Sequence, residues 1–264
     1  MHRTLDLPAR TKKPRQHGLT AIHEVGCPVG ELRHILSDFH ELLDIAKLGV
    51  GAAYITPKLE EKVALYREFQ VECYFGGTLF EKFYYQSKID DYVSYLKDLG
   101  VNWVEISTGT VDISLSDRAR LIERFNKDFH VVSEVGSKDE QTVMPPSEWM
   151  REIQTLLDAG ARYVITEGRN SGTAGVYRAS GEIRTGLVAD IISHLDVNRI
   201  IFEAPKPEHQ MYFIKQVGPN VNLGNVPPRE LLLLEAQRCG LRYETFFVKD
   251  ESRKAHADKA DSGA

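Results

Sequence analysis

The chain has 264 residues, of which 42% are hydrophobic and 27% are charged, and this composition is typical of a globular protein with a substantial core. A net charge of -5 and a pI near 6.0 argue against a nucleic-acid-binding protein, because binding to a phosphate backbone needs a surplus of basic residues. The sequence has no uncharged apolar run of 18 residues and no apolar segment near its start, which argues against a membrane-spanning or secreted protein.

The three cysteines, Cys27, Cys73 and Cys239, are far apart in the sequence and form no C-x-x-C pair. This spacing suggests neither a disulfide framework nor a zinc site. We therefore expect reduced thiols and a cytoplasmic protein.

Short apolar segments alternate with amphipathic stretches along the chain, and this alternation is typical of parallel β/α units. Eight segments are predicted as strands: residues 18–23, 42–48, 70–75, 101–107, 130–134, 163–167, 199–203 and 221–223. Eight stretches with apolar residues three and four positions apart are predicted as helices: residues 29–40, 57–69, 89–99, 116–127, 147–159, 186–195, 207–217 and 229–239. Ser116, followed by Asp117, is expected to cap the fourth of these helices.

Eight consecutive units favour a single (β/α)8 TIM barrel, an α/β fold that takes about 250 residues. An open doubly wound sheet usually has a G-x-G-x-x-G turn after its first strand, whereas residues 23–28 here read His-Glu-Val-Gly-Cys-Pro. We expect residues 1–12 to form a flexible N-terminal arm, residues 13–248 the barrel, and residues 249–264 a disordered tail. The basic residues near the N-terminus could be solvated or could bind an anion.

A barrel brings the residues that follow each strand to one shared rim, where such proteins keep their active sites. Five of these residues are carboxylates: Glu24, Glu105, Glu134, Glu167 and Glu203. Close carboxylates repel one another unless a cation intervenes, and hard oxygen ligands without a histidine cluster favour Mg²⁺ or Mn²⁺ over zinc. The candidate metal ligands are Glu24, Glu134, Glu167 and Glu203. The alternative is that single glutamates pair with Lys47, Lys138 or Arg169 in a buried network.

The three rim cations, Lys47, Lys138 and Arg169, suit a substrate that carries phosphate and carboxylate groups. Turns with glycine could bring backbone N–H groups to the same anions. The candidate binding residues are Arg169, Gly76, Gly77, Ser171 and Gly172, with Asn222, Gly224 and Asn225 around the last strand. The scattered histidines His23, His130 and His209 are expected to be structural or exposed rather than catalytic.

An ordered set of motifs resembles the phosphosulfolactate synthase family. The motifs are Lys13-Pro-Arg-x-x-Gly-Leu-Thr20, Lys47-x-Gly-x-Gly51, Gly76-Gly-Thr-Leu-Phe-Glu81, Val104-Glu-Ile-Ser107, Ser133-Glu-Val-Gly136 with Lys138, Glu167-Gly-Arg-x-Ser-Gly172, Ile201-Phe-Glu-Ala-Pro205, Val221-Asn-Leu-Gly-Asn225 and Gly240-Leu-Arg242. The resemblance covers roughly residues 12–247.

This resemblance implies a (β/α)8 enzyme, a carbon–sulfur lyase that adds sulfite to phosphoenolpyruvate with Mg²⁺. The product would be (2R)-2-phospho-3-sulfolactate, on a route to coenzyme M or another sulfonate. The negative charge that forms on the substrate needs electrostatic stabilisation, and its α-carbon must then be protonated. Lys138 is the first candidate for that acid and Lys47 the second, with Glu105 as a further catalytic residue. Arg169 would hold the phosphate or the sulfite.

The sequence departs from the family's pattern at Glu24, Thr108 and Glu244, where the family has Asp. In the first of these motifs, Thr-x-x-Ile-Asp becomes Thr20-Ala-Ile-His-Glu24. Two alternatives therefore stay open. One is a divergent barrel enzyme that adds another nucleophile to a phosphorylated enol acid, and the other is a non-catalytic protein of the heat-stress-associated type. The apolar residues Leu231–Leu234 could serve as a surface between subunits of a homo-oligomer.

Overall fold

Eight short strands run parallel in one sheet, in the order β3-β2-β1-β8-β7-β6-β5-β4, within a computed structural model that describes residues 4–137, 144–169 and 171–248. The strands are β1 (Thr20–Glu24), β2 (Ile45–Leu48), β3 (Glu72–Phe75), β4 (Trp103–Ile106), β5 (His130–Val135), β6 (Tyr163–Thr166), β7 (Ile200–Glu203) and β8 (Leu223–Val226). The two end strands, β3 and β4, lie against each other and nearly close the sheet. The predicted (β/α)8 barrel is therefore confirmed.

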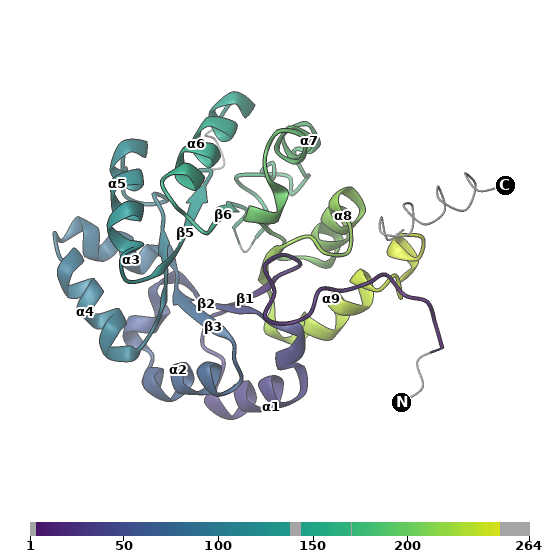
Figure 1. Cartoon of the computed structure of the whole chain (residues 1–264), viewed down its shortest axis with the longest axis horizontal. Helices are drawn as coiled ribbons and strands as arrows, with labels where there is room; N and C mark the ends of the chain where they lie inside the picture. The colour runs from purple at the N-terminus through teal and green to yellow at the C-terminus, as the bar shows by residue number, and fades with distance from the viewer. Residues whose placement is uncertain (1–3, 138–143, 170, 249–264) are drawn as a thin grey trace, which may run out of the picture.

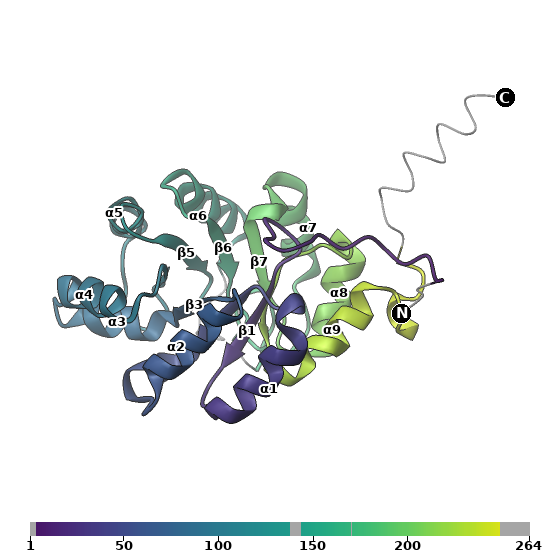
Figure 2. The same ribbon diagram turned by 60° about the horizontal axis from the view of Figure 1, so that its bottom comes forward.

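Helices form a ring around these strands (Figure 1), and Figure 2 shows the strands enclosed by that ring. They are α1 (Val29–Phe39), α2 (Leu59–Glu68), α3 (Gly77–Tyr85), α4 (Ile89–Leu99), α5 (Leu115–Phe125), α6 (Pro146–Asp158), α7 (Thr185–His194), α8 (Pro207–Val217) and α9 (Leu231–Arg238). Short 3-10 helices are η1 (His40–Leu42), η2 (Gly49–Ile55), η3 (Val197–Arg199), η4 (Pro228–Glu230) and η5 (Tyr243–Thr245).

Helix α3 was not expected, because Gly76-Gly77 is typical of a turn. Burial of Leu79 and Phe80 stabilises the helix in spite of its glycine start. A Cβ atom on Gly77 would lie 2.1 Å from the Ser107 hydroxyl oxygen. The glycine is therefore needed for close packing between α3 and the end of β4.

The start of α5 also differs from the expectation. The side chain of Ser114, rather than that of Ser116, accepts a hydrogen bond from the backbone N–H of Asp117. The helix therefore begins at Leu115, one residue before the predicted start. Either serine fits the sequence pattern of a cap, and the path of the chain leaving β4 decides between them.

Two apolar cores stabilise the barrel. The larger core lies between the strands and the helices, and the smaller one fills the inside of the barrel. The inner core consists of Leu19, Ala21, Ile45, Tyr74, Trp103, Val132, Tyr163, Ile165 and Ile201. Side chains two positions apart on a strand share a face. Hence Lys47 lies above Ile45, Glu105 above Trp103 and Glu203 above Ile201, so the apolar inner layer carries a polar layer.

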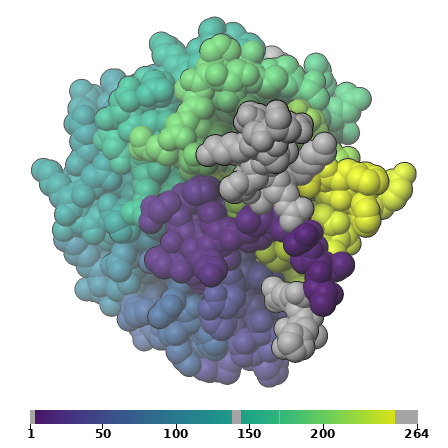
Figure 3. All heavy atoms as spheres, turned by 45° about the vertical axis from the view of Figure 1, so that its right-hand side comes forward, coloured from purple at the N-terminus to yellow at the C-terminus, as the bar shows by residue number. Residues whose placement is uncertain are grey.

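The N-terminal segment lies across the amino-terminal side of the barrel, as the purple spheres in Figure 3 show. Arg10 donates to Glu235 at 3.1 Å and to the Pro219 carbonyl oxygen at 2.9 Å, and it also contacts Asn220. Part of the predicted arm thus contacts the barrel. The predicted tail, residues 249–264, lies outside the described residues.

No helix in the described part of the chain is long and apolar enough to cross a membrane. In the apolar run at the start of α9, Leu231 and Leu234 are buried while Leu232 and Leu233 are exposed. Association through this helix stays a prediction.

Candidate active site

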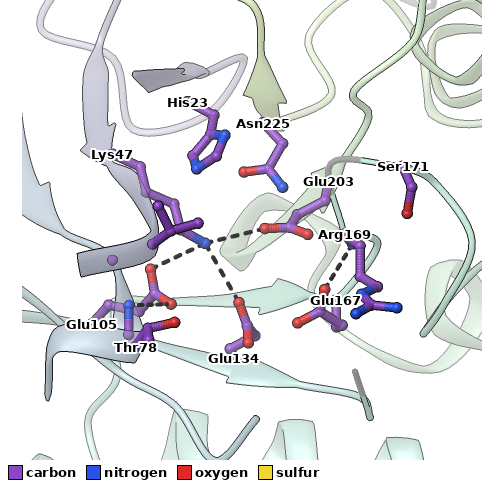
Figure 4. Close-up of a pocket in the computed structure, with 13 residues that line it drawn as sticks. His23, Lys47, Thr78, Glu105, Glu134, Glu167, Arg169, Ser171, Glu203 and Asn225 are labelled. Atoms are coloured by element: carbon purple, nitrogen blue, oxygen red, sulfur yellow. Dashed lines mark hydrogen bonds and ion pairs between the residues drawn. The ribbon is translucent and has the colours of Figure 1, made fainter. Parts of the chain in front are cut away.

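A cavity of about 520 Å³ opens where the strands end at their carboxyl termini. Its lining residues, most of which Figure 4 labels, are His23, Lys47, Val50, Gly76, Gly77, Thr78, Glu105, Glu134, Glu167, Arg169, Ser171, Glu203 and Asn225. Each of the eight β/α units contributes at least one of these residues, as expected for a barrel whose loops meet at one rim. We call this cavity the rim pocket.

Lys47 lies at the centre of the charges in the rim pocket. Its Nζ is 3.2 Å from Glu105 Oε2, 3.2 Å from Glu203 Oε1 and 3.5 Å from Glu134 Oε2 (Figure 4). Burial alone would lower the pKa of Lys47, but the three carboxylates outweigh it and raise the pKa well above its usual value. Lys47 is therefore a permanent positive charge at neutral pH, with three buried carboxylates as its partners.

Glu105 links Lys47 to the first turn of α3. Its Oε1 accepts a hydrogen bond of 3.0 Å from the backbone N–H of Gly77, while its Oε2 faces Lys47. A carboxylate at a helix N-terminus is stabilised by the partial positive charge of the exposed N–H groups. Glu105 also spans the seam between β4 and β3, so it holds the barrel together where the two strands lack regular pairing.

Glu203 and Glu167 shape the loop that follows β6. Glu203 Oε2 accepts from the Gly168 N–H at 2.8 Å, and Glu167 Oε1 accepts from the Arg169 N–H at 2.7 Å. These contacts accompany a left-handed backbone at Arg169, with φ of 54°. The pKa of Glu203 is raised, first by burial and also by Glu134, while Lys47 opposes the rise. Glu203 is thus more easily protonated than an ordinary glutamate carboxyl.

Thr108, one of the departures from the family's pattern, does not line the rim pocket. Its hydroxyl donates to the Val111 carbonyl oxygen at 2.8 Å and accepts from the Ile113 N–H at 2.9 Å. The neighbouring N–H groups of Gly109 and Val111 donate to the carboxylate of Glu81 at 3.0 and 2.8 Å. Thr108 therefore stabilises the loop after β4.

The structure separates Glu24 from the other predicted metal ligands. Its carboxylate pairs with Lys62 Nζ at 2.9 Å and accepts from the Cys27 N–H at 2.5 Å. Glu24 is paired in register with Leu48, whose side chain belongs to the outer core, so both point toward the helices. The expected convergence of five carboxylates is wrong for this reason, and four share the rim pocket.

Asn222 also lies away from the rim pocket. Its side chain accepts from the Leu19 N–H at 3.0 Å and donates to the carbonyl oxygens of Asn198 and Ile200 at 2.8 and 3.0 Å. The strand β8 begins at Leu223 rather than at the predicted residue 221, so Asn222 directly precedes it. Its partners accordingly lie at the amino-terminal ends of β1 and β7. Asn222 thus fixes the start of the strand and is not placed to bind substrate.

The other predicted residues are distributed as follows. Gly76, Gly77, Ser171, Arg169 and Asn225 line the rim pocket. Gly224 lies in β8 opposite Glu203, and Gly172 packs closely against the ring of His209. Lys138 lies outside the described residues.

His23 lines the rim pocket, although the sequence favoured a structural or exposed position. It is paired in register with Lys47 on β2, so both side chains point into the barrel. The alternation of β1 could have revealed this, because His23 shares a face with Leu19 and Ala21 while Glu24 does not.

Within the described residues, the rim pocket has no set of side chains that could hold a divalent cation by themselves. Among residues 4–137, 144–169 and 171–248, no group of three or more His, Cys, Asp or Glu side chains is arranged to hold a metal ion. The oxygen donors of Glu134 and Glu167 nevertheless have the chemistry that Mg²⁺ prefers. A metal here would therefore need ligands from the substrate or from water in addition to carboxylates.

A family model described as (2R)-phospho-3-sulfolactate synthase (ComA) matches residues 8–244. The phosphosulfolactate synthase of Bacillus subtilis is 41% identical over 248 residues, which cover 93% of this chain and 98% of that relative. The chain belongs to the phosphosulfolactate synthase family. A second member, from Methanothermobacter thermautotrophicus, is 39% identical over 90% of this chain and 95% of the relative.

Other similarities extend beyond phosphosulfolactate synthases. The protein HEAT-STRESS-ASSOCIATED 32 of Arabidopsis thaliana is 24% identical over 81% of this chain and 83% of its own. Among solved structures, 3-hexulose-6-phosphate synthase from Salmonella typhimurium superposes with a TM-score of 0.52 at 14% identity, covering 83% of this chain and 98% of that one. The structural match reflects the shared barrel fold alone.

Proposed function

We propose that this member of the family catalyses the addition of sulfite to phosphoenolpyruvate and gives (2R)-2-phospho-3-sulfolactate. In this reaction the lone pair on sulfur forms a bond to the methylene carbon C3, the C2–C3 double bond breaks, and its electron pair moves onto C2 and the carboxylate. A proton then adds to C2. The observation that carries the proposal is family membership over residues 8–244, together with the charged rim pocket.

Lys47 would stabilise the charge that develops on the substrate carboxylate. Its ammonium is held at the floor of the pocket by Glu105, Glu134 and Glu203, so no reorganisation is needed when the charge forms. Arg169 and Ser171 line the pocket from the loop after β6 and would bind a phosphate or sulfite oxygen. This division assigns Lys47 to the reacting carbons and Arg169 to an outer oxyanion.

The proton donor to C2 is a separate part of the proposal. Lys138, the first candidate, lies outside the described residues. Lys47 is a weaker acid than an ordinary lysine, since carboxylates overcome the effect of burial and raise its pKa. We therefore keep Lys138 as the acid. Lys138→Ala is expected to lower kcat by about 10²–10⁴-fold, and full turnover by this variant would remove that role.

We propose Mg²⁺ as the cofactor, with Glu134 and Glu167 as its protein ligands. Mg²⁺ usually keeps several waters and takes one or two carboxylates together with substrate oxygens, a mode that suits the absence of a three-residue cage from the described chain. When bound, it would neutralise negative charge on the substrate. Glu203 and Glu105 would meanwhile keep Lys47 in place.

The decisive experiment incubates the protein with phosphoenolpyruvate, sulfite and Mg²⁺ and follows the ³¹P NMR spectrum. A new phosphoester signal that requires sulfite supports the proposal, and the Lys47→Met variant serves as the control. A new signal with another nucleophile but not with sulfite would favour the divergent enzyme. Unchanged substrate, with no shift in melting temperature on adding ligand, would favour the non-catalytic alternative.

We further propose that the protein acts on these small molecules in the cytoplasm. None of its three cysteines, Cys27, Cys73 and Cys239, forms a disulfide bond in the described part of the chain, which agrees with a reducing compartment. Neither a nucleic acid nor a membrane enters this proposal.

A further inference from the structure

The rim pocket has two chemically different walls. Strands β4, β5 and β7 and the residue that follows β6 contribute its four carboxylates, whereas β1 and β8 contribute the uncharged side chains of His23 and Asn225. In Figure 4 these two side chains lie next to each other and point into the pocket, on the side away from Glu134. An anionic substrate group is repelled by carboxylates, so it is expected to lie against the uncharged wall.

Gly49 makes room for the imidazole of His23. A Cβ atom on Gly49 would lie 1.7 Å from His23 Nε2, and the three nearest atoms to it all belong to that ring. The backbone of Gly49 is not left-handed, so conformation does not demand a glycine here. The absence of a side chain at Gly49 therefore serves to position His23.

His23 is an uncharged hydrogen-bonding group in this position. Burial, followed by the nearby charge of Lys47, lowers its pKa to about 4. A neutral imidazole offers one N–H donor and one acceptor nitrogen. The imidazole of His23 can therefore donate a hydrogen bond to an oxyanion. Because it is uncharged, it is not attracted to the carboxylates on the opposite wall.

Asn225 is turned toward His23 by an irregularity in β8. Thr20 and Ile22 of β1 are paired with Leu223 and Val226, so β8 has one more residue than β1 over this interval. Asn225 has a left-handed backbone with φ of 55°, and such bulges redirect side chains next to active sites. Without the bulge, alternation would direct this side chain toward the helices.

Asn225 is 7% exposed, and its side-chain Oδ1 has no hydrogen-bond partner in the described part of the chain. A buried polar atom without a partner is costly, and it is expected where a ligand completes the site. A half-turn about the terminal side-chain bond exchanges the oxygen for the NH₂ group, which can donate to an oxyanion.

From this juxtaposition we propose that His23 and Asn225 form the subsite for the phosphate group of the substrate, with His23 as a neutral hydrogen-bond donor. The inference rests on the proposed synthase activity for the identity of the phosphorylated substrate. Barrels commonly bind phosphate near their last two strands, and β8 supplies Asn225. His23, from β1, extends that subsite and would discriminate between phosphorylated and unphosphorylated enol acids.

The first test compares His23→Leu with His23→Gln, which keeps a donor. The loss of a hydrogen bond to a charged group is expected to raise the KM for phosphoenolpyruvate about 10- to 100-fold in the leucine variant, with a much smaller change in kcat and in the KM for sulfite. His23→Gln should recover most of the affinity. His34→Gln, on the exposed surface of α1, is the matched control.

The second test uses the contact between Gly49 and His23 in a double-mutant cycle. Gly49→Ala is expected to weaken binding of phosphoenolpyruvate about as much as His23→Ala, because the new methyl group displaces the ring. In the His23→Ala background, Gly49→Ala should add little. If His23→Leu does not fold, Gly49→Ala and its double variant with His23→Ala test the same subsite and retain every other polar group.

Calorimetry with phosphoenolpyruvate or inorganic phosphate separates this inference from the proposed activity. A wild-type protein that binds both ligands but does not react with sulfite, and whose binding is lost in His23→Leu, would retain the subsite and reject the synthase proposal. A folded His23→Leu variant with wild-type affinity for both ligands overturns the subsite. Equal rises in the KM for both substrates would also contradict it, since they would indicate a general disturbance of the pocket.

Discussion

Lys47 and Arg238 are two buried cations at opposite ends of the same barrel, and they are held in opposite ways. Lys47 lies among three carboxylates beside a cavity. Arg238 is fully buried and donates to the backbone carbonyl oxygens of Pro219 and Val221 at 2.7 Å and of Leu19 at 3.0 Å. Carboxylates raise the pKa of Lys47, whereas burial, with help from Arg10, lowers the pKa of Arg238 well below its usual value.

The difference shows which buried charge belongs to the scaffold and which to the site. Arg238 donates to backbone carbonyl oxygens at the amino-terminal end of the barrel, and it does not line the rim pocket. Lys47 has carboxylate partners that need a cation nearby, and these partners line the rim pocket, where a ligand can bind. Burial and charge alone therefore do not distinguish a scaffold cation from a site cation, whereas the chemistry of the hydrogen-bond and ion-pair partners does.

The largest expected effect is on stability and concerns Arg238. Arg238→Leu removes three hydrogen bonds that a buried charged donor makes to backbone carbonyl oxygens, and we expect it to lower the free energy of unfolding by about 4 kcal/mol. Chemical denaturation measures this loss. The exposed Arg229→Leu is the control and should change little. If Arg238→Leu abolished phosphoenolpyruvate binding in a protein that remained folded, the division between scaffold and site would be wrong.

Lys47→Met tests the other member of the pair. Loss of a preorganised charge at the reacting group is expected to lower kcat about 10²–10³-fold, equivalent to about 3–4 kcal/mol of transition-state stabilisation. The three carboxylates then lose their cation, so their pKa values should rise and the variant should be more stable at pH 5 than at pH 8. Turnover and denaturation curves at both pH values check this. Wild-type kcat, or stability independent of pH, would contradict the role.

His23 provides a pH test that does not depend on activity. Its pKa is about 4 in the folded protein against 6.5 for the ordinary group, so its contribution to stability is present above pH 6.5 and is lost as the pH falls toward 4. Facing it are Lys47 from β2, the uncharged Asn225 from β8 and Gly49 from η2. Relative to His23→Leu, the wild-type protein should lose about 3 kcal/mol over this interval. Parallel stability curves for the two proteins would refute the shift.

The smallest effect concerns the cap of α5, which is distant from the polar layer. Ser114→Ala removes the acceptor for the Asp117 N–H and is expected to cost about 1 kcal/mol of unfolding free energy, with the KM for phosphoenolpyruvate unchanged. Ser116→Ala is the matched control and should be close to neutral. Thermal denaturation of the two variants distinguishes the caps, and equal losses would contradict the assignment to Ser114.

The sequence predicted the barrel and most of the pocket because both depend on local and periodic features. Apolar segments in alternation with amphipathic helices specify β/α units, and polar residues at strand ends must meet at one rim. Lys47, Glu105, Glu134, Glu167 and Glu203 were found in this way, and the structure brings them together. The family motifs follow the same strand ends, and the family assignment agrees with them.

What the sequence could not decide was the direction of individual side chains. Glu24 and His23 are neighbours on β1, so their side chains point to opposite faces of the strand. Glu24 contacts Lys62 on α2, whereas His23 lines the pocket. Asn222 and Asn225 are separated by the start of β8 and its bulge, so one fixes the base of the barrel and the other faces the pocket. Lys47 and Arg238 likewise acquire their roles only from residues that are distant in the chain. Composition and periodicity determined the fold and the rim of this protein, whereas strand register and packing, which arise from contacts between distant segments, determined which polar groups share the site.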